Sequence, residues 1–240
     1  MTNRQIQIRG IPDIQLAVFD MAGTTVNDED SVNRCLRDAL RAAGYEVTPD
    51  QVNAVMGIFK PDAIRILIGD SIPSDSIEQQ VNAIHDDFVN RTIGFYRVDP
   101  SVFEVPGATR TFECLHKAGI KVALNTGFNR EITDVILKRL GWNDNALIDA
   151  TITSDEVSRG RPHPDMIRAL MVRFGIDDPK EVAKIGDTPA DLGEGLSAGC
   201  GLIVGVTEGT HTRAQLEAHP HTHLIGSIVE LPRLLGLRED

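Results

Sequence analysis

The sequence predicts an α/β fold in which a doubly wound parallel sheet carries an inserted helical cap. From about residue 105 onward, short apolar runs alternate with helical patterns, which is the order that forms a parallel sheet. The first apolar run, residues 14–19, stands apart from this series, because only helical patterns follow it over residues 28–102. Polar residues follow several of the runs, and open α/β sheets bind their ligands at that edge.

Six short apolar runs are expected to form the strands of the sheet. They cover residues 14–19, 121–125, 150–153, 182–185, 202–206 and 223–225. Between them, segments such as 132–140 and 166–174 carry apolar residues at helical spacing. We therefore expect a Rossmann-like core domain made of residues 1–27 and 103–240.

The segment 28–102 interrupts this alternation and is expected to form a helical cap domain above the strand ends. Its first helix is expected to have Ser31 as N-cap and to be followed by Gly44. Pro49 and Pro61 each mark the beginning of a further helix, and a fourth helix follows them. An insertion at this point places the cap over the ligand-binding edge.

Composition and charge exclude several classes of function. The 240 residues include 24 basic and 35 acidic side chains, and this negative net charge of -11 disfavours binding to nucleic acid or to anionic membranes. No run of 18 apolar residues and no secretory leader is recognisable. Cys35, Cys114 and Cys200 are widely spaced, which favours reduced thiols and a cytoplasmic protein over a disulfide or zinc framework.

Residues suited to phosphoryl chemistry follow the predicted strands. Asp20 directly follows the first run, and Asp187 lies in the turn that begins with Gly186 after the fourth, so two carboxylates are expected at one sheet edge, where they suit Mg²⁺. A carboxylate at the position of Asp20 can also act as a nucleophile. Thr126, after the second run, and Arg161 can bind phosphoryl oxygens.

These segments, in this order, resemble the motifs of the haloacid dehalogenase superfamily over nearly the whole chain. Most members have a second Asp two positions after the nucleophile and a Lys at the position of Arg161. This chain has Ala22 and Arg161 instead, as the phosphonatase (phosphonoacetaldehyde hydrolase) group of that superfamily does. That group also has a cap lysine shortly after Met-Gly, which matches Lys60 in the segment Met56-Gly57-Ile58-Phe59-Lys60.

The resemblance implies a Mg²⁺-dependent hydrolase that cleaves the C–P bond of phosphonoacetaldehyde or a related 2-oxoalkylphosphonate. Lys60 would form a Schiff base with the carbonyl group, and Asp20 would accept the phosphoryl group as an aspartyl phosphate. The other implied site residues are the magnesium ligands Asp20, Ala22 (through its carbonyl) and Asp187, the phosphonate-binding Thr126, Gly127 and Arg161, the substrate-pocket residues Thr24 and Met56, and Asp191 behind the metal. The resemblance also implies a homodimer formed through the cap.

This chemistry is consistent with the residues themselves. C–P cleavage expels a carbanion, which an iminium ion two atoms from phosphorus can accept as an enamine. An acid at the position of Ala22 is then unnecessary. The lysine must be neutral to attack, and Lys60 stands beside Pro61 at an expected helix start, where the helix dipole and burial both lower an amine pKa.

Two positions depart from the phosphonatase pattern. The histidine three residues after the cap lysine is replaced by Ala63, and the aromatic residue after the nucleophile by Met21, so the resemblance is better to the phosphonatase-like sister group. Two alternatives stay open. One is a phosphatase acting on a small phosphate monoester, similar to phosphoglycolate phosphatase, and the other is a non-catalytic binding module.

Overall fold

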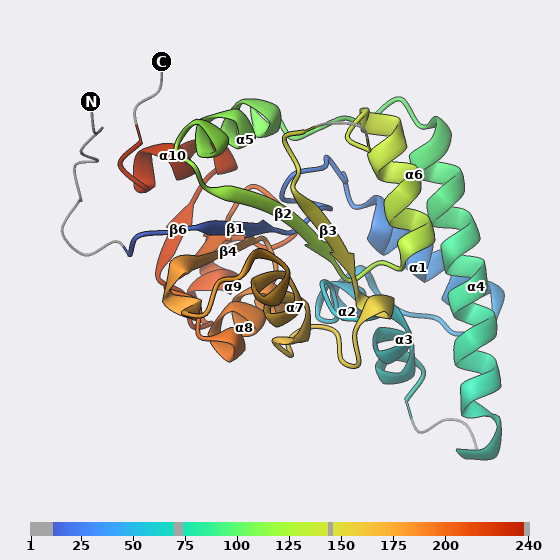
Figure 1. Ribbon diagram of the computed structural model, residues 1–240. Coiled ribbons are helices and arrows are strands. Elements are labelled where there is room, and N and C mark those ends of the chain that lie inside the picture. Colours follow the sequence, from blue (N-terminus) through green and yellow to red (C-terminus); the bar gives the residue numbers. More distant parts are fainter. Residues whose placement is uncertain (1–11, 70–73, 144–145, 238–240) are drawn as a thin grey trace, which may run out of the picture.

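The computed structural model describes residues 12–69, 74–143 and 146–237 and contains the predicted parallel sheet (Figure 1). Its strands are β1 (Leu16–Phe19), β2 (Lys121–Thr126), β3 (Ala150–Thr153), β4 (Val182–Gly186), β5 (Leu202–Val206) and β6 (His223–Ile225). Every pairing is parallel and the order is β3-β2-β1-β4-β5-β6. The strand predictions and the doubly wound fold class are confirmed.

Helices cover both faces of the sheet (Figure 1). They are α5 (Ala108–Lys117), α6 (Arg130–Leu140), α7 (Asp165–Phe174), α8 (Pro189–Ala198), α9 (Arg213–Glu217) and α10 (Leu231–Leu234), with 3₁₀ turns at Ser154–Glu156, Pro179–Glu181 and Ile228–Glu230. One apolar cluster lies between the sheet and α5, α6 and α10, and a second lies between the sheet and α7, α8 and α9. The two clusters make the three-layer arrangement in which a parallel sheet is buried on both faces.

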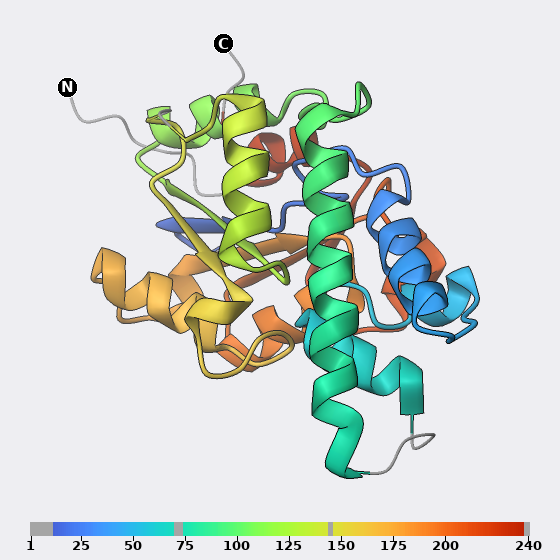
Figure 2. The same ribbon diagram turned by 90° about the vertical axis from the view of Figure 1, so that its right-hand side faces the viewer.

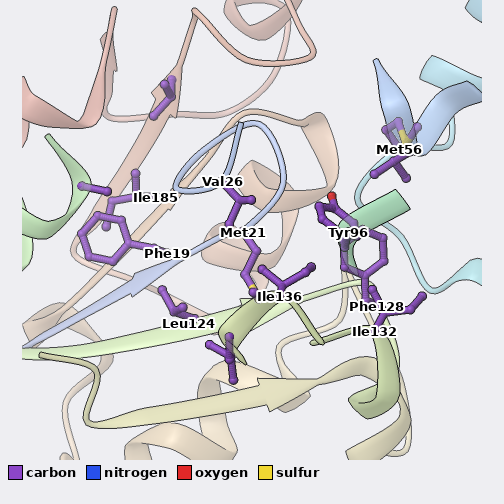
Figure 3. Packing of buried hydrophobic residues seen from close by; sticks show 14 of the residues in the cluster. Phe19, Met21, Val26, Met56, Tyr96, Leu124, Phe128, Ile132, Ile136 and Ile185 are labelled. Carbon is purple, nitrogen blue, oxygen red and sulfur yellow. The ribbon is translucent and has the colours of Figure 1, made fainter. Parts of the chain in front are cut away.

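Four helices between β1 and α5 form the inserted cap: α1 (Ser31–Ala42), α2 (Pro49–Asn53), α3 (Lys60–Ile68) and α4 (Ser74–Val98). Both α1 and α3 pack on α4, which lies beside α6 of the core (Figure 2). Cap and sheet side chains belong to one apolar cluster, part of which is drawn in Figure 3. Among the described helices, none combines the length and the apolar character that a membrane span requires.

The insertion agrees with the predicted cap. The division into domains 1–27 with 103–240 and 28–102 stays a prediction, and its residues 1–11, 70–73, 144–145 and 238–240 lie outside the described part of the chain.

The prediction that Ser31 is the N-cap of the first helix is wrong. Ser31 is already helical, and the cap position belongs to Asp30, whose side chain makes no capping bond. The backbone turns left-handed at Glu29 and Asp30, with φ of 44° and 64°. Because of that turn, the free N–H of Val32 is reached by Asp28, whose Oδ1 accepts it at 3.1 Å.

Candidate active site

A pocket lies at the carboxyl edge of the sheet, where the cap meets the ends of β1, β2 and β4. Its lining residues are Asp20, Ala22, Asp28, Val32, Met56, Gly57, Lys60, Thr126, Gly127, Phe128, Arg161, Thr188 and Thr210. The register of β1 and β4 pairs Phe19 with Ile185, so Asp20 and Asp187 leave adjacent strands at the same edge. Ligands bind at such edges in doubly wound sheets.

Asp20 is held in place by its backbone and by Arg161. Its N–H donates to the Ile185 carbonyl at 2.8 Å, and its side chain is almost fully buried. Burial raises the pKa of Asp20 to about 7, and the positive charge of Arg161 opposes that rise. The Arg161 Nη1 donates to Asp20 Oδ1 at 2.5 Å, which orients the carboxylate and favours its ionised form.

All three guanidinium nitrogens of Arg161 contact acceptors of the protein. Nε donates to Glu194 Oε2 at 3.0 Å, and Nη2 donates to the carbonyl and to Oδ1 of Asn125, both at 2.7 Å. Nη1 also lies 2.9 Å from Asp191 Oδ1. Arg161 lines the pocket, but its observed role is to hold Asp20, and binding of phosphonate oxygens by Arg161 stays a prediction.

Lys184 is a second buried cation, which the sequence interpretation missed. It lies within β4 with no exposed surface, and its Nζ is 2.7 Å from Asn125 Oδ1, 2.9 Å from Asp191 Oδ1 and 3.5 Å from Glu194 Oε2. Burial raises the pKa of Asp191, but Arg161 and Lys184 outweigh it and the net pKa is lowered. The sequence signal for the burial of Lys184 was its position within an apolar run, because a parallel sheet buries such a run on both faces.

Asp187 is fully buried and oriented by two donors. Thr24 Oγ1 donates to its Oδ1 at 2.9 Å, and the Thr210 N–H donates to its Oδ2 at 2.7 Å. Burial raises the pKa of Asp187 to about 6, and the charge of Asp191 adds to that rise. Thr24, predicted as a substrate-pocket residue, does not line the pocket and instead supports Asp187.

Three of these carboxylates form a group that fits a divalent cation. Oxygens of Asp20, Asp187 and Asp191 all lie within 4.8 Å of one another, and all three side chains are buried. Together with Glu194, and within the described part of the chain, they place four carboxylates in one cluster with two cations, Arg161 and Lys184, which leaves an excess of negative charge. Hard carboxylate oxygens with uncompensated charge match the ligand preference of Mg²⁺. Ala22 lines the pocket beside them.

We expect Thr24→Val to weaken magnesium binding without unfolding the protein. The substitution keeps the side-chain shape but removes the 2.9 Å hydrogen bond that orients Asp187. Loss of a partner that orients a metal ligand costs roughly 10- to 100-fold in metal affinity. Titration calorimetry with Mg²⁺ measures the change, and an unchanged dissociation constant would contradict the role of Thr24.

Lys60 is the first residue of α3, and its ammonium group is enclosed by aromatic rings. The residue is 3% exposed, and Nζ lies 5.7 Å from the ring centroid of Phe128 and 6.0 Å from that of Phe88. Within the described part of the chain, it makes no hydrogen bond or ion pair through Nζ. Burial favours the neutral amine that a Schiff base needs and outweighs the attraction of the two ring faces for the charged form.

The pKa of Lys60 is lowered to about 8. Burial is the main cause, the carboxylates of Asp20 and Asp28 oppose it, and Arg161 adds to it. We expect the rate of acylation of this amine to rise with pH to a midpoint near 8. Competitive labelling read by peptide mass spectrometry measures it, with the exposed Lys138 as reference. A midpoint near the ordinary value of 10.5 would contradict the burial argument.

At Gly127, the backbone of the core lies against the backbone of the cap. A Cβ there would lie 2.8 Å from the carbonyl oxygen of Ile58 and 2.9 Å from that of Gly57. Gly57 has φ of +82°, and a Cβ on it would lie 2.3 Å from Thr188 Oγ1. Glycine is therefore required on both sides of this contact. The predicted residues Gly127, Met56 and Thr126 all line the pocket.

The chain resembles known hydrolases along most of its length. Residues 14–199 match the model of the haloacid dehalogenase-like hydrolases. The phosphonoacetaldehyde hydrolase of Latilactobacillus sakei subsp. sakei (strain 23K) is 29% identical, over 93% of this chain and 88% of that protein.

Two solved structures are similar in fold. A phosphonoacetaldehyde hydrolase like protein from Oleispira antarctica has a TM-score of 0.78 at 20% identity, covering 96% of this chain and 95% of its own. A predicted phosphoglycolate phosphatase from Haemophilus somnus 129PT has a TM-score of 0.75 at 19% identity, covering 94% and 99%. The match to the family model, the inserted cap and the acidic strand ends agree, and the chain belongs to the haloacid dehalogenase-like hydrolases, among which it resembles the phosphonoacetaldehyde hydrolases.

Proposed function

We propose that this hydrolase cleaves the C–P bond of phosphonoacetaldehyde or a related 2-oxoalkylphosphonate through an imine on Lys60 and a phosphoenzyme on Asp20. The observation that carries the proposal is a buried lysine, without an ion-pair partner among the described residues, in the same pocket as a nucleophilic carboxylate. Ala22 stands where a phosphatase would need an acid for its leaving group. The relative that is 29% identical is named for this reaction.

The first half of the reaction prepares the leaving group. The neutral amine of Lys60 attacks the carbonyl carbon, a C–N bond forms, and the carbonyl oxygen leaves as water after it has been protonated. The product is an iminium ion two atoms from phosphorus. The rings of Phe88 and Phe128 keep the surroundings of the Lys60 nitrogen apolar, which limits hydrolysis of the imine.

The second half transfers the phosphoryl group. A carboxylate oxygen of Asp20 attacks phosphorus, the C–P bond breaks, and its electron pair moves into the iminium to give an enamine. Water then hydrolyses the aspartyl phosphate to inorganic phosphate. Protonation of the enamine carbon and hydrolysis of the resulting imine release the carbonyl product and restore Lys60, so the net change consumes one water.

The protein residues control charge during these steps. Arg161 holds the Asp20 carboxylate toward the pocket, and Thr126 and Gly127, which line the pocket, would bind phosphonate oxygens. Asp20 and Asp187 would hold Mg²⁺, with the carbonyl of Ala22 as a further ligand, and the ion would shield the negative charges of phosphonate and nucleophile from each other. Thr24 and Thr210 keep Asp187 in position for that purpose.

The test compares phosphonates with a phosphate ester in the presence of Mg²⁺. Phosphonoacetaldehyde and 2-oxopropylphosphonate cover the aldehyde and the ketone, and 2-phosphoglycolate represents the phosphatase alternative. We expect equimolar phosphate and carbonyl product from at least one phosphonate. Borohydride added during turnover should leave a reduced adduct on the peptide that contains Lys60.

The results separate the candidate functions. Turnover of 2-phosphoglycolate without adduct formation or phosphonate cleavage would replace the proposal by the phosphatase. Absence of turnover and of any adduct with all three compounds would overturn the proposal and favour the binding module. The proposed homodimer through the cap is tested separately by light scattering.

A further inference from the structure

We propose that Asp28 is the proton-transfer partner of Lys60 during imine formation. Asp28 takes the proton from the amine nitrogen of Lys60 and delivers it to the departing oxygen. The inference rests on the proposed function, because it concerns the same pocket and the same lysine. It assigns a role to a residue that the sequence interpretation did not single out.

The position of Asp28 supports this role. The side chain is buried at the rim where β1 passes into the cap, and both Asp28 and Lys60 line the pocket. Its Oδ1 accepts the Val32 N–H at 3.1 Å and lies 3.5 Å from the Tyr96 hydroxyl. Its Oδ2 receives no hydrogen bond from the described residues. One oxygen therefore fixes the carboxyl group and the other is available to the pocket.

The surroundings bring the pKa of the Asp28 carboxyl group close to neutral pH. Burial raises the pKa of Asp28 to about 6, and Asp30 adds to the rise. The Val32 N–H, Lys60 and the Tyr96 hydroxyl oppose it. An acid–base catalyst works best when its pKa lies near the operating pH, because it must both accept and donate the proton.

Two packed aromatic side chains, Tyr96 and Phe128, link Asp28 to Lys60. Tyr96 packs edge-on against Phe128, with 5.9 Å between ring centroids, and the two side chains lie next to each other in Figure 3. Phe128 is also the ring nearest to the Lys60 ammonium group, at 5.7 Å. The carboxyl group and the amine thus share an environment with little access to water.

Imine formation requires a proton to move within this environment. When the Lys60 nitrogen attacks the carbonyl carbon, the nitrogen becomes cationic and the oxygen anionic. Asp28 accepts a proton from nitrogen and delivers it to the anionic oxygen, which gives a neutral carbinolamine. Asp28 then takes up one proton from solvent water and delivers it to the hydroxyl oxygen as the C–O bond breaks. Water leaves, the iminium ion forms, and Asp28 ends as a carboxylate.

Other candidates for this role are placed less well. Ala63 has no titratable group and is fully buried. His85 on α4 stacks on Phe88 and senses the charge of Lys60, but it does not line the pocket. Asp20 lines the pocket, but Arg161 holds it and the proposed reaction needs it as the nucleophile.

The experiment measures imine formation separately from C–P cleavage. Asp20→Asn removes the nucleophile, so the reaction stops at the imine, and borohydride quenching at successive times gives the rate of adduct formation with phosphonoacetaldehyde. This rate is followed between pH 6 and 9 for Asp20→Asn alone and together with Asp28→Asn. The matched control is Asp62→Asn, which removes an exposed carboxylate two residues from Lys60.

We expect Asp28→Asn to lower the rate by roughly 100-fold across this pH range, because general acid–base catalysis contributes about that much or more. A purely electrostatic role gives a different result. The charge of Asp28 raises the pKa of Lys60, as that of Asp20 does, while Arg161 lowers it. Removal of the Asp28 charge alone would therefore shift the profile to lower pH and leave its plateau unchanged, which would overturn the proposal.

The outcomes separate a failure of the proposed function from a failure of the role of Asp28. If the Asp20→Asn protein forms no adduct at all, the proposed function fails and this inference fails with it. If both proteins form the adduct at equal rates, only the role of Asp28 fails. If Asp28→Asn does not unfold cooperatively, Asp28→Glu decides, because a carboxyl group moved by one methylene should slow the step, and an unchanged rate would refute the role.

Discussion

Lys60→Arg is expected to abolish phosphate release from phosphonoacetaldehyde, with a loss of about 1,000-fold or more, as for other residues on which a covalent step depends. Arginine keeps the positive charge but stays protonated and cannot form an imine. A steady-state assay of phosphate and acetaldehyde measures the loss. The same variant should still hydrolyse p-nitrophenyl phosphate, whose leaving group needs neither an acid nor an imine.

The control for this substitution is Lys138→Arg on the exposed face of α6, which should leave both activities unchanged. Loss of p-nitrophenyl phosphate hydrolysis in Lys60→Arg would indicate a distorted site rather than a missing imine. Retention of phosphonoacetaldehyde cleavage by Lys60→Arg would exclude the lysine mechanism.

Lys184→Met is expected to lower the free energy of unfolding by about 3–5 kcal/mol. Methionine fills a volume similar to that of lysine, so the expected loss of stability comes from removal of the positive charge. Without the ammonium group, Arg161 is the one cationic partner that Asp191 and Glu194 keep among the residues that the structure describes, and these three side chains have no exposed surface. Urea denaturation followed by circular dichroism measures the change.

Two further variants identify the source of that loss. Lys121→Met removes an exposed ammonium group paired with Asp149 and should cost no more than about 1 kcal/mol. Glu194→Gln combined with Lys184→Met removes one of the carboxylates left unpaired, and it should recover part of the stability. A loss in Lys184→Met as small as that in Lys121→Met would show that the cluster does not depend on this cation.

The parts of the site that follow strands could be predicted from the sequence. Asp20 and Asp187 directly follow β1 and β4, Thr126 is the last residue of β2, and parallel strands bring their carboxyl ends to one edge. Lys60 could be found through its place in a motif at the beginning of a helix. Its nearly complete burial could not, because the aromatic rings that enclose it belong to α4 and to the loop after β2.

The supporting network could not be predicted in the same way. Glu194 lies on α8 and Asn125 on β2, and only tertiary packing brings them to Arg161. Asp28 belongs to an acidic segment that is typical of a solvated loop, yet its side chain is buried and accepts hydrogen bonds from the Val32 N–H and the Tyr96 hydroxyl. Thr210 lies in a short Gly-Thr segment that matches no phosphate-loop pattern, yet its N–H orients Asp187.

The glycine contact between cap and core has a consequence for selectivity. At Gly127 the main chain of the cap rests on the main chain of the core, with no side chain between them that could be compressed. This backbone contact therefore sets the distance between the Lys60 amine in the cap and the Asp20 carboxylate in the core. In the proposed reaction a substrate would have to bridge that span with its own atoms, so a rigid backbone dimension would select the number of bonds between its carbonyl carbon and its phosphorus.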